Sequence, residues 1–315
     1  MLHITNGESV VQSFREGAIP GSYLPWNDAL HDGPVPDVPT LAELSDIRAR
    51  FLSQPEEEGY EQIRSSFAAR DRTLADSLAH DEIVLWFEHD LFDQLQLLQL
   101  LDWFSIQKSE GPRLSLIRVD AFPGIQPFYG LGQLTGQQLA TLFPARQAVT
   151  VEQLTLGREA WRAFRASDPA GLASLLKEES SGLPFLRAAL RRFLEEYPWV
   201  HDGLSRNQRQ ILRAVDAGAR SKPDIYAASR QFEECPWGDL SVYWRIAALA
   251  SAPNPALKHF APGEYEITEF GHQLLAGNAD WMHSSGSVDI WLGGVHLSSA
   301  DAPWRWNNDL QTLTS

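Results

Sequence analysis

The sequence has a single cysteine, Cys235, among its 315 residues. One cysteine excludes a disulfide within the chain and a zinc site built from several thiolates. The chain also lacks an apolar run near the roughly 20 residues that cross a bilayer. Its first residues, MLHITNGESVVQ, have neither the basic flank nor the apolar core of a signal peptide. We therefore expect a cytoplasmic protein with no membrane-spanning segment.

Positive charge is scarce. The chain has 26 Lys and Arg against 41 Asp and Glu, for a formal net charge of −15. The imbalance is concentrated in residues 1–130, which hold 9 cationic and 21 anionic side chains. Such a surface repels phosphate backbones, which argues against non-specific nucleic-acid binding by this part. A small anionic ligand held by backbone N–H groups is still compatible with it.

The first part of the chain alternates between strand and helix patterns. Four apolar runs predict strands: LHIT (2–5), GSYLPW (21–26), EIVLWF (82–87) and RLSLIRV (113–119). Helical spacing follows in residues 10–16, 40–53, 60–79 and 93–104, and Ser9 is placed to N-cap the first of these helices. This alternation predicts an α/β fold with a parallel, Rossmann-like sheet in residues 1–130.

The rest of the chain divides by pattern into three further parts. Residues 131–199 have helical spacing. Residues 200–281 show three helices, a hairpin pattern in KHFAPGEYEIT and a closing helix, and this order predicts a winged-helix-like domain. Residues 282–315 have strand character in DIWLGGVHL and WRWN, and we expect this C-terminal segment to return to the first domain.

The winged-helix-like part has little positive charge with which to bind DNA. It holds 8 Lys and Arg against 10 Asp and Glu, and its third helix, GDLSVYWRIAALAS, has only Arg245 as a cation. A DNA reader normally shows a basic face there. Nucleic acid is therefore the less favoured partner, and packing against protein, including oligomer formation through this domain, is the more favoured one.

Polar clusters follow three of the predicted strands. They are His3, Asn6, Gly7, Glu8 and Ser9; Trp26, Asp28, His31, Asp32 and Gly33; and Glu88, His89, Asp90, Asp93 and Gln94. Ligands of open parallel sheets bind beyond the carboxyl ends of the strands, where such loops meet. We therefore expect the three clusters to converge on one site.

Each cluster also has a structural interpretation. Asn6 with Gly7 is a common turn dipeptide, and Asp90 and Asp93 suit the start of a helix. Capping the helix requires neither Glu88 nor His89. Ionisable groups at the end of a buried strand have perturbed titration if they stay inside, which is how a general acid or base is made. The alternative, that both point to water at the sheet edge, stays open.

Signals for a metal or a cofactor are weak. The side chains of His31, His89, Asp28, Glu88 and Asp90 are suitable ligands for zinc or manganese, but no HxH, HxxxH or HExxH spacing occurs. The chain has no P-loop, and GLGQLTG (130–136) lacks the preceding strand of a dinucleotide fingerprint. The sequence therefore leaves both the metal and the cofactor unknown.

Four strings, LHITNGES, PWNDALHDGP, WFEHDLFDQLQLLQLLDWF and WLGGVHL, closely resemble the bacterial family called domain of unknown function 1835. The first 120 or so residues look like the named domain, and the remainder looks like the C-terminal extension of one branch. Glu8 stands where the family usually has Asp, and His89 matches the closer branch only. The shared pattern falls on His3, Gly7, Ser9, Asp28, Gly33, Pro34, Asp93 and Gln94. The resemblance implies a site between the three loops without specifying its chemistry.

The sequence thus favours a hydrolase or group-transfer enzyme acting on a small polar, nucleotide-like substrate. Glu88 or His89 is the expected general base, and the Asn6–Ser9 turn is expected to present N–H groups to an anion. The expected substrate-binding residues are His3, Asn6, Gly7, Ser9, Trp26, Asp28, His31, Asp93, Gln94 and His296. One alternative is a ligand-sensing regulator whose winged helix contacts DNA or protein, and another is a partner-binding component of a defence system.

Overall fold

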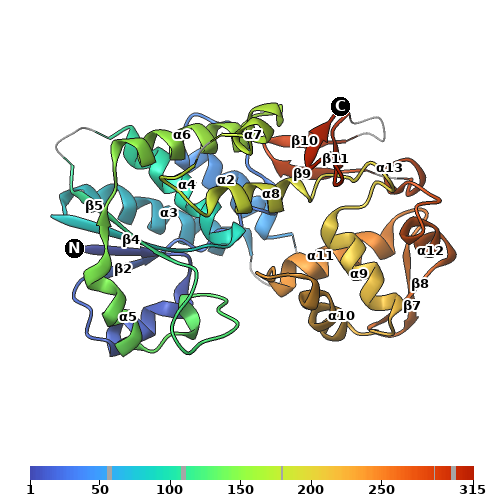
Figure 1. The fold of residues 1–315 in the computed structure, drawn as a ribbon, viewed down its shortest axis with the longest axis horizontal. Helices are drawn as coiled ribbons and strands as arrows, with labels where there is room; N and C mark the ends of the chain where they lie inside the picture. The colour runs from blue at the N-terminus through green and yellow to red at the C-terminus, as the bar shows by residue number, and fades with distance from the viewer. Residues whose placement is uncertain (55–58, 108–110, 179, 287, 299–302) are drawn as a thin grey trace. The chain divides into compact units, whose positions relative to one another are not determined.

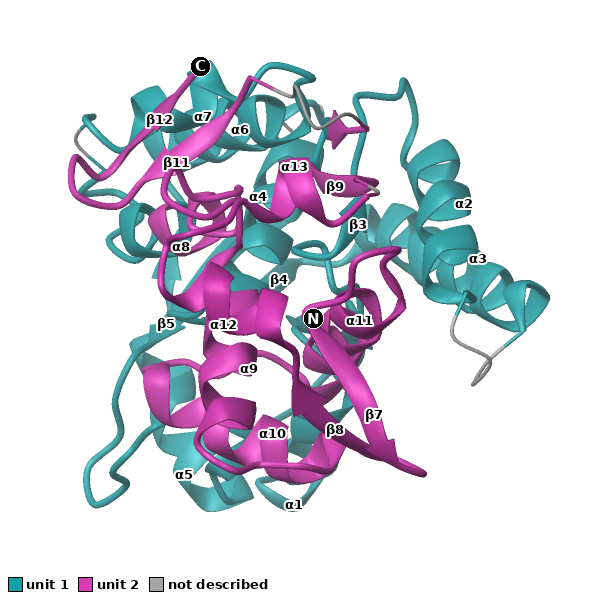
Figure 2. Ribbon diagram, turned by 90° about the vertical axis from the view of Figure 1, so that its right-hand side faces the viewer, with its two compact units in different colours: residues 1–190, 293–295 teal, residues 191–292, 296–315 magenta. Residues whose placement is uncertain are grey.

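The chain divides into two compact units (Figure 2). The computed structural model describes residues 1–54, 59–107, 111–178, 180–286, 288–298 and 303–315. One unit comprises residues 1–190 with 293–295, and the other comprises residues 191–292 with 296–315. No helix in the described ranges is long and apolar enough to span a membrane.

A five-stranded sheet forms the centre of the first unit, in the order β2-β1-β4-β5-β6. The strands are β1 (Leu2–Thr5), β2 (Ser22–Pro25), β4 (Glu82–Glu88), β5 (Arg113–Val119) and β6 (Gln147–Ala148). The first four in this order run parallel, which confirms the predicted mixed α/β fold. The edge strand β6 is antiparallel to β5 and was not predicted, because two residues are too short for a periodic pattern.

Helices cover both faces of this sheet (Figure 1). They include α1 (Val11–Glu16), α4 (Leu91–Ser105), α5 (Gly136–Leu142) and α6 (Val151–Arg165). Val84 and Trp86 of β4 share one buried cluster with Phe14 of α1 and Leu139 of α5. Figure 1 shows α4 and α6 on the opposite side of the sheet from α5. Because β4 is covered on both sides, every one of its residues is buried, as its unbroken apolar run predicts.

Helix α4 is itself buried on nearly all sides. Asp90 caps it by accepting a hydrogen bond from the Asp93 N–H at 2.8 Å. Leu95, Leu98 and other leucines line its buried surface. On α6, a Cβ at Gly157 would lie 2.5 Å from Leu101 Cβ, so the two helices approach each other closely only because this residue is glycine.

The prediction that Ser9 caps the first helix is wrong. A 3-10 turn, η1 (Glu8–Val10), begins after Gly7 and leads into α1, and neither start has a side-chain cap. Ser9 is exposed. The Thr5 hydroxyl donates to the Gly7 carbonyl at 2.9 Å, so this upstream side chain organises the turn instead.

The strand order creates a topological switch point between β1 and β4. The chain first passes from β1 to its neighbour β2. It then runs through α2 (Leu41–Leu52) and α3 (Tyr60–Asp76) and returns on the other side of β1 as β4. The loops that leave β1 and β4 therefore diverge, and ligands of open α/β sheets bind in the crevice between such loops.

The long loop after β2 contains a short strand, β3 (Gly33–Pro34). The next residue, Val35, donates its N–H to the Gly293 carbonyl at 2.7 Å. Gly294 in turn donates to the Phe164 carbonyl at 3.0 Å. A Cβ at Gly294 would lie 1.8 Å from the Arg165 carbonyl oxygen, which explains why a glycine stands here. Residues 287 and 299–302 of the predicted C-terminal strand segment lie outside the described residues.

The second unit contains three helices followed by a hairpin and a further helix. In chain order these are α9 (Arg206–Asp216), α10 (Lys222–Ser229), α11 (Asp239–Ser251), β7 (Leu257–Ala261), β8 (Glu264–Ile267) and α12 (Glu269–Leu275). Ile211, Ile246 and Leu257 belong to their shared core. A capping box formed by Ser205 and Gln208 starts α9.

Several shorter elements complete the described chain. They are α7 (Ala170–Leu175), α8 (Leu186–Leu194), α13 (Trp281–Ser284), β9 (Ile290–Gly293), β10 (Val295–Leu297), β11 (Arg305–Asn307) and β12 (Thr312–Thr314). The strands β11 and β12 pair antiparallel.

Candidate active site

Three carboxylates gather at the point where β4 passes into α4. One oxygen from each of Glu88, Asp90 and Asp93 lies within 4.8 Å of the others. Glu88 ends the strand and is 4% exposed, and Asp93 stands in the first turn of the helix and is fully buried. A buried strand running directly into a buried helix leaves little water around these groups.

Hydrogen bonds fix the carboxylate of Asp93 across the switch point. Its Oδ1 accepts from the Glu88 N–H and its Oδ2 accepts from the Asn6 side-chain amide, both at 2.7 Å. Gln94 donates to the Glu88 carbonyl at 2.6 Å. The loop after β1 is therefore joined to the end of β4, as convergence of the first and third clusters requires.

The Glu88 carboxylate is covered by a loop that was not among the three polar clusters expected to form the site. The N–H of Leu131, at the start of the 3-10 turn η3 (Leu131–Gln133), donates to Glu88 Oε1. Gly130, with φ of +149°, comes so close that a Cβ there would lie 2.1 Å from Glu88 Oε2. The glycines of residues 130–136 were visible in the sequence, but nothing local tied them to a carboxylate 43 residues away.

Burial controls the titration of the cluster. It raises the pKa of Glu88 to about 8, with the charge of Asp90 adding to the shift and the Leu131 N–H opposing it. Burial likewise raises the pKa of Asp93 well above its ordinary value, and the charges of Glu88 and Asp90 raise it further. Among the described residues, no Lys or Arg forms an ion pair with the three carboxylates. At neutral pH the cluster therefore retains a proton on Glu88, which favours a general-acid role over the base role expected from sequence.

His89 lies partly buried beside the cluster. Its ring stacks on Phe128 with centroids 6.5 Å apart and meets Phe185 edge-on at 6.1 Å. Its charge opposes the rise that burial causes in the pKa of Asp90. The structure thus places His89 next to the carboxylates, held between two phenylalanine rings.

The second cluster is mainly structural. Asp28 is 1% exposed and pairs with Arg48 at 2.9 Å and with Arg70 at 3.9 Å. Trp26 is fully buried, donates its indole N–H to Gln99 at 2.7 Å and lies under the Arg70 guanidinium. The substrate-binding role expected for Asp28 and Trp26 has no support from these contacts, because both side chains are committed to the fold.

His31 is the part of the second loop that reaches α4. It is 5% exposed, and its ring meets the Phe92 ring edge-on with centroids 5.8 Å apart. Its Nε2 lies 3.4 Å from an oxygen of Asp32. Because Phe92 directly precedes Asp93, His31 packs against the helix turn that carries the carboxylate.

His3 has a structural role rather than the expected substrate-binding one. It is fully buried, its Nδ1 accepts from the Trp86 indole N–H, and its Nε2 donates to the Pro20 carbonyl, both at 3.0 Å. Trp86 can only donate and a carbonyl can only accept, so the ring is neutral with its proton on Nε2. Burial accordingly lowers the pKa of His3. Neither ring nitrogen is left for a ligand.

The remaining expected residues are separated. Gly7 faces the loop after β2, since a Cβ there would lie 3.0 Å from Asn27 Oδ1. The exposed Ser9 approaches the covering loop, because a Cβ at Gly132 would lie 3.4 Å from its hydroxyl. His296 belongs to the second unit, where it pairs with Asp289 at 2.7 Å and stacks on a tryptophan ring.

The three carboxylates could hold a divalent cation in place of the proton. An all-oxygen set suits Mg²⁺, Mn²⁺ or Ca²⁺ better than zinc. Asp28, which the sequence offered as a ligand, is paired with arginines instead. Both oxygens of Asp93 already accept one hydrogen bond each, so it would bind a cation through its remaining lone pairs.

No family model matches the chain, and no curated protein matches it significantly. The resemblance to domain of unknown function 1835 thus stays a prediction from the four motif strings.

Proposed function

We propose that the chain is a hydrolase or group-transfer enzyme whose reaction takes place beyond the carboxyl ends of β1 and β4. The observation that carries this proposal is the buried Glu88, with a pKa of about 8, at the switch point of a parallel sheet. A carboxylic acid that keeps its proton at neutral pH is suited to proton transfer, and such perturbed groups gather at functional sites.

In the proposed reaction, Glu88 gives its proton to the leaving group as water or an acceptor hydroxyl attacks the substrate. The bond to the leaving group breaks, and Glu88 becomes an anion stabilised by the Leu131 N–H. The proton of the attacking group then restores Glu88. Asp93 and Asn6 position the end of the strand during this cycle.

We propose a small polar substrate of nucleotide-like character, which suits a site at the switch point of such a sheet. We also retain the winged-helix fold for the second unit, membership of the family named above and a cytoplasmic location as predictions.

A substrate screen with matched variants tests the proposal. Nucleotides and other phosphate or acyl esters are offered to the full chain, with and without Mg²⁺ or Mn²⁺. For any substrate turned over, Glu88→Gln should lower kcat at least about 100-fold, the usual contribution of a general acid. Glu82→Gln changes the buried glutamate at the other end of β4 and should leave kcat nearly unchanged. Equal activity of wild type and Glu88→Gln refutes the assignment.

The same screen tests whether a cation takes part. If Mg²⁺ or Mn²⁺ replaces the proton, activity disappears with a chelator and returns with the metal, and Asp93→Asn binds the metal more weakly by calorimetry. Activity that is unaffected by a chelator would mean that Glu88 acts as a proton donor and that no cation takes part in the reaction.

A second candidate function is a ligand-sensing regulator, favoured by the order of α9, α10, α11 and the hairpin β7–β8. DNA is a less favoured partner of such a regulator than protein. Arg245, the cation of α11, hydrogen-bonds to Glu196 at 3.3 Å and lies over the Trp237 ring at 4.6 Å. We therefore favour protein contact or self-association, which sedimentation of the full chain measures directly. A monomer at all concentrations contradicts self-association.

A further inference from the structure

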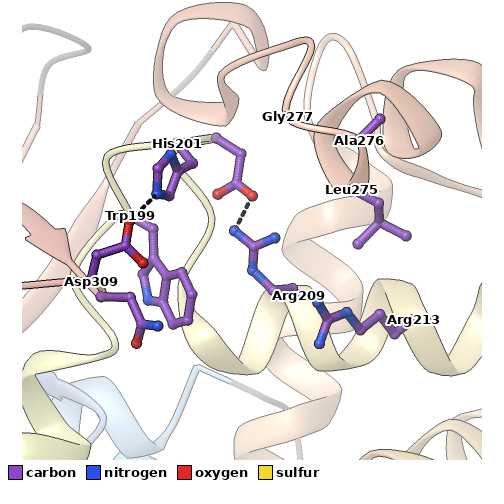
Figure 3. Close-up of a pocket in the computed structure, with 10 residues that line it drawn as sticks. Trp199, His201, Arg209, Arg213, Leu275, Ala276, Gly277 and Asp309 are labelled. Carbon is purple, nitrogen blue, oxygen red and sulfur yellow. Dashed lines mark hydrogen bonds and ion pairs between the residues drawn. The ribbon is translucent and has the colours of Figure 1, made fainter.

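A pocket of about 610 Å³ lies wholly within the second unit, away from any residue of the candidate active site in sequence (Figure 3). The side of α9 forms one wall, and the end of α12 forms another. The lining residues are Trp199, His201, Asp202, Arg209, Arg213, Leu275, Ala276, Gly277, Asn308 and Asp309. A volume of this size is typical of sites for small molecules.

The two arginines of this pocket differ in their partners. Arg209 pairs with the buried Asp202, and His201 lies 3.4 Å from Asp309 (Figure 3). Arg213 is exposed, and no described residue forms a hydrogen bond or ion pair with its guanidinium. The guanidinium of Arg213 is therefore paired with no described side chain, although Asp202 and Asp309 balance the two arginines in formal charge when His201 is neutral.

Arg209 also retains unused hydrogen-bonding capacity. Its Nη2 donates to Asp202, but its Nε is buried with no hydrogen-bond partner among the described residues. Its guanidinium lies over the Trp199 ring, 4.7 Å from the centroid, which limits its movement. Burial lowers the pKa of Arg209, Asp202 opposes that shift and the nearby Arg213 adds to it. Two guanidinium groups are thus close enough to repel each other.

Arg209 and Arg213 stand one helical turn apart on the same face of α9. They also line a neighbouring hollow of about 250 Å³, which shares Trp199 and Asn308 with the larger pocket. Adjacent guanidinium groups are the arrangement that proteins use to bind the oxygens of a phosphate, because each presents several N–H donors in a planar fork.

We infer that this pocket binds a phosphate-bearing small molecule. Its phosphate pairs with Arg213 and the free donors of Arg209, and its remainder lies against Trp199 and Leu275. The doubly charged phosphate would be a direct partner for the Arg213 guanidinium and would reduce the repulsion between the two arginines. This site is independent of Glu88 and gives the second unit a ligand of its own.

Calorimetric titration of the full chain tests the inference with three probes: inorganic phosphate, adenosine 5′-monophosphate and adenosine. We expect inorganic phosphate to bind weakly, the nucleotide to bind more tightly and adenosine not to bind. In Arg213→Gln, affinity for both phosphate probes should fall about tenfold or more, as expected for the loss of a charged hydrogen bond. This variant should fold normally, because Arg213 has no partner among the described residues.

Two control variants test whether the loss of affinity is specific to this pocket. Arg191→Gln removes another exposed arginine of the second unit that does not line the pocket, so it should bind like wild type. Glu88→Gln should also bind phosphate like wild type, which separates this site from the proposed active site. Arg209 is left unchanged because its substitution would leave the buried Asp202 carboxylate without its ion-pair partner.

Four results would overturn the inference. They are no binding of either phosphate probe at about 10 mM, equal binding by wild type and Arg213→Gln, equal loss in Arg191→Gln, and adenosine binding as tightly as its monophosphate. A parallel titration with duplex DNA covers the macromolecular source of phosphate. Tight DNA binding that needs Arg213 and falls steeply with salt would replace the small molecule with nucleic acid.

Discussion

Glu82 and Glu88 stand at opposite ends of β4 and titrate in opposite directions. Burial acts on both. At Glu82, hydrogen bonds from Arg146, Arg113 and Ser115 outweigh burial and lower the pKa to about 2. At Glu88 no cation among the described residues opposes burial, and the pKa rises to about 8. Neighbouring groups, rather than the residue type, thus decide which glutamate keeps a proton at neutral pH.

This contrast predicts how stability depends on pH. A carboxyl whose pKa is raised on folding stabilises the fold below its unfolded pKa, near 4.5, and that contribution is lost as the pH rises towards the folded value of about 8. Glu88→Gln should therefore remove part of the fall in Tm between pH 5 and 8. Thermal unfolding of both proteins across this range measures the effect.

Glu82→Gln serves as the control with the opposite sign. The lowered pKa of Glu82 stabilises the fold above about pH 4.5, and this contribution is lost as the pH falls towards about 2. The variant should therefore lose stability at neutral pH without changing the slope between pH 5 and 8. A Glu88→Gln profile parallel to that of wild type would mean that Glu88 titrates normally.

Gly130 is predicted to be intolerant of any side chain. Gly130→Ala should lower the free energy of unfolding by about 2 kcal/mol or more, because its Cβ would meet the Glu88 carboxylate and its φ is positive. Gly124→Ala, in the same connection, has a φ of +82°, but apart from its chain neighbours no described residue lies within 4 Å of the added Cβ, so it reports backbone strain alone. Urea unfolding compares them, and equal losses would remove the contact with Glu88 from the explanation.

At the scale of elements, the loop after β2 depends on one buried arginine. Arg48 of α2 is fully buried, pairs with Asp28 and donates to the carbonyls of Asp32 at 2.6 Å and of Ala29 at 2.9 Å. These bonds satisfy loop carbonyls that would otherwise be buried without partners. The helix thereby fixes the loop that carries His31.

Removing this arginine should be costly. Arg48→Met leaves the buried Asp28 carboxylate without its main partner and should lower the free energy of unfolding by about 3–5 kcal/mol. Arg50→Met, on the same helix, removes a side chain that is 67% exposed and should cost less than about 1 kcal/mol. Denaturant titrations of the two variants decide this, and similar small losses would show that Arg48 does not hold the loop.

Local sequence signals predicted the elements better than the site. The apolar run of β4 and the Asp90 cap of α4 depend on neighbours in sequence, so they were predicted correctly. The partners of Asp28, His3 and Glu88 come from distant segments and were not readable. The arginines that pair with Asp28 look like ordinary helix-surface residues until the fold buries them.

At the scale of the whole molecule, the net charge of −15 should prevent non-specific DNA binding. Arg245, the cation of α11, is already paired with Glu196, so this helix presents no basic face of the kind that reads DNA. We expect no shift in the fluorescence anisotropy of labelled duplex DNA at about 0.15 M salt. Binding that survives this salt and is lost in Arg213→Gln would contradict both this expectation and the small-molecule pocket.

The proposed chemistry requires that Glu88 keep a proton at neutral pH beside Asp90 and Asp93. Carbon-13 NMR of the glutamate side-chain carboxyls, with the Glu88 signal identified by its absence in Glu88→Gln, follows that proton directly. We predict a titration midpoint of about 8, shifted downwards in Asp90→Asn because a neighbouring negative charge is removed. A midpoint near the ordinary value of 4.5 would contradict the account.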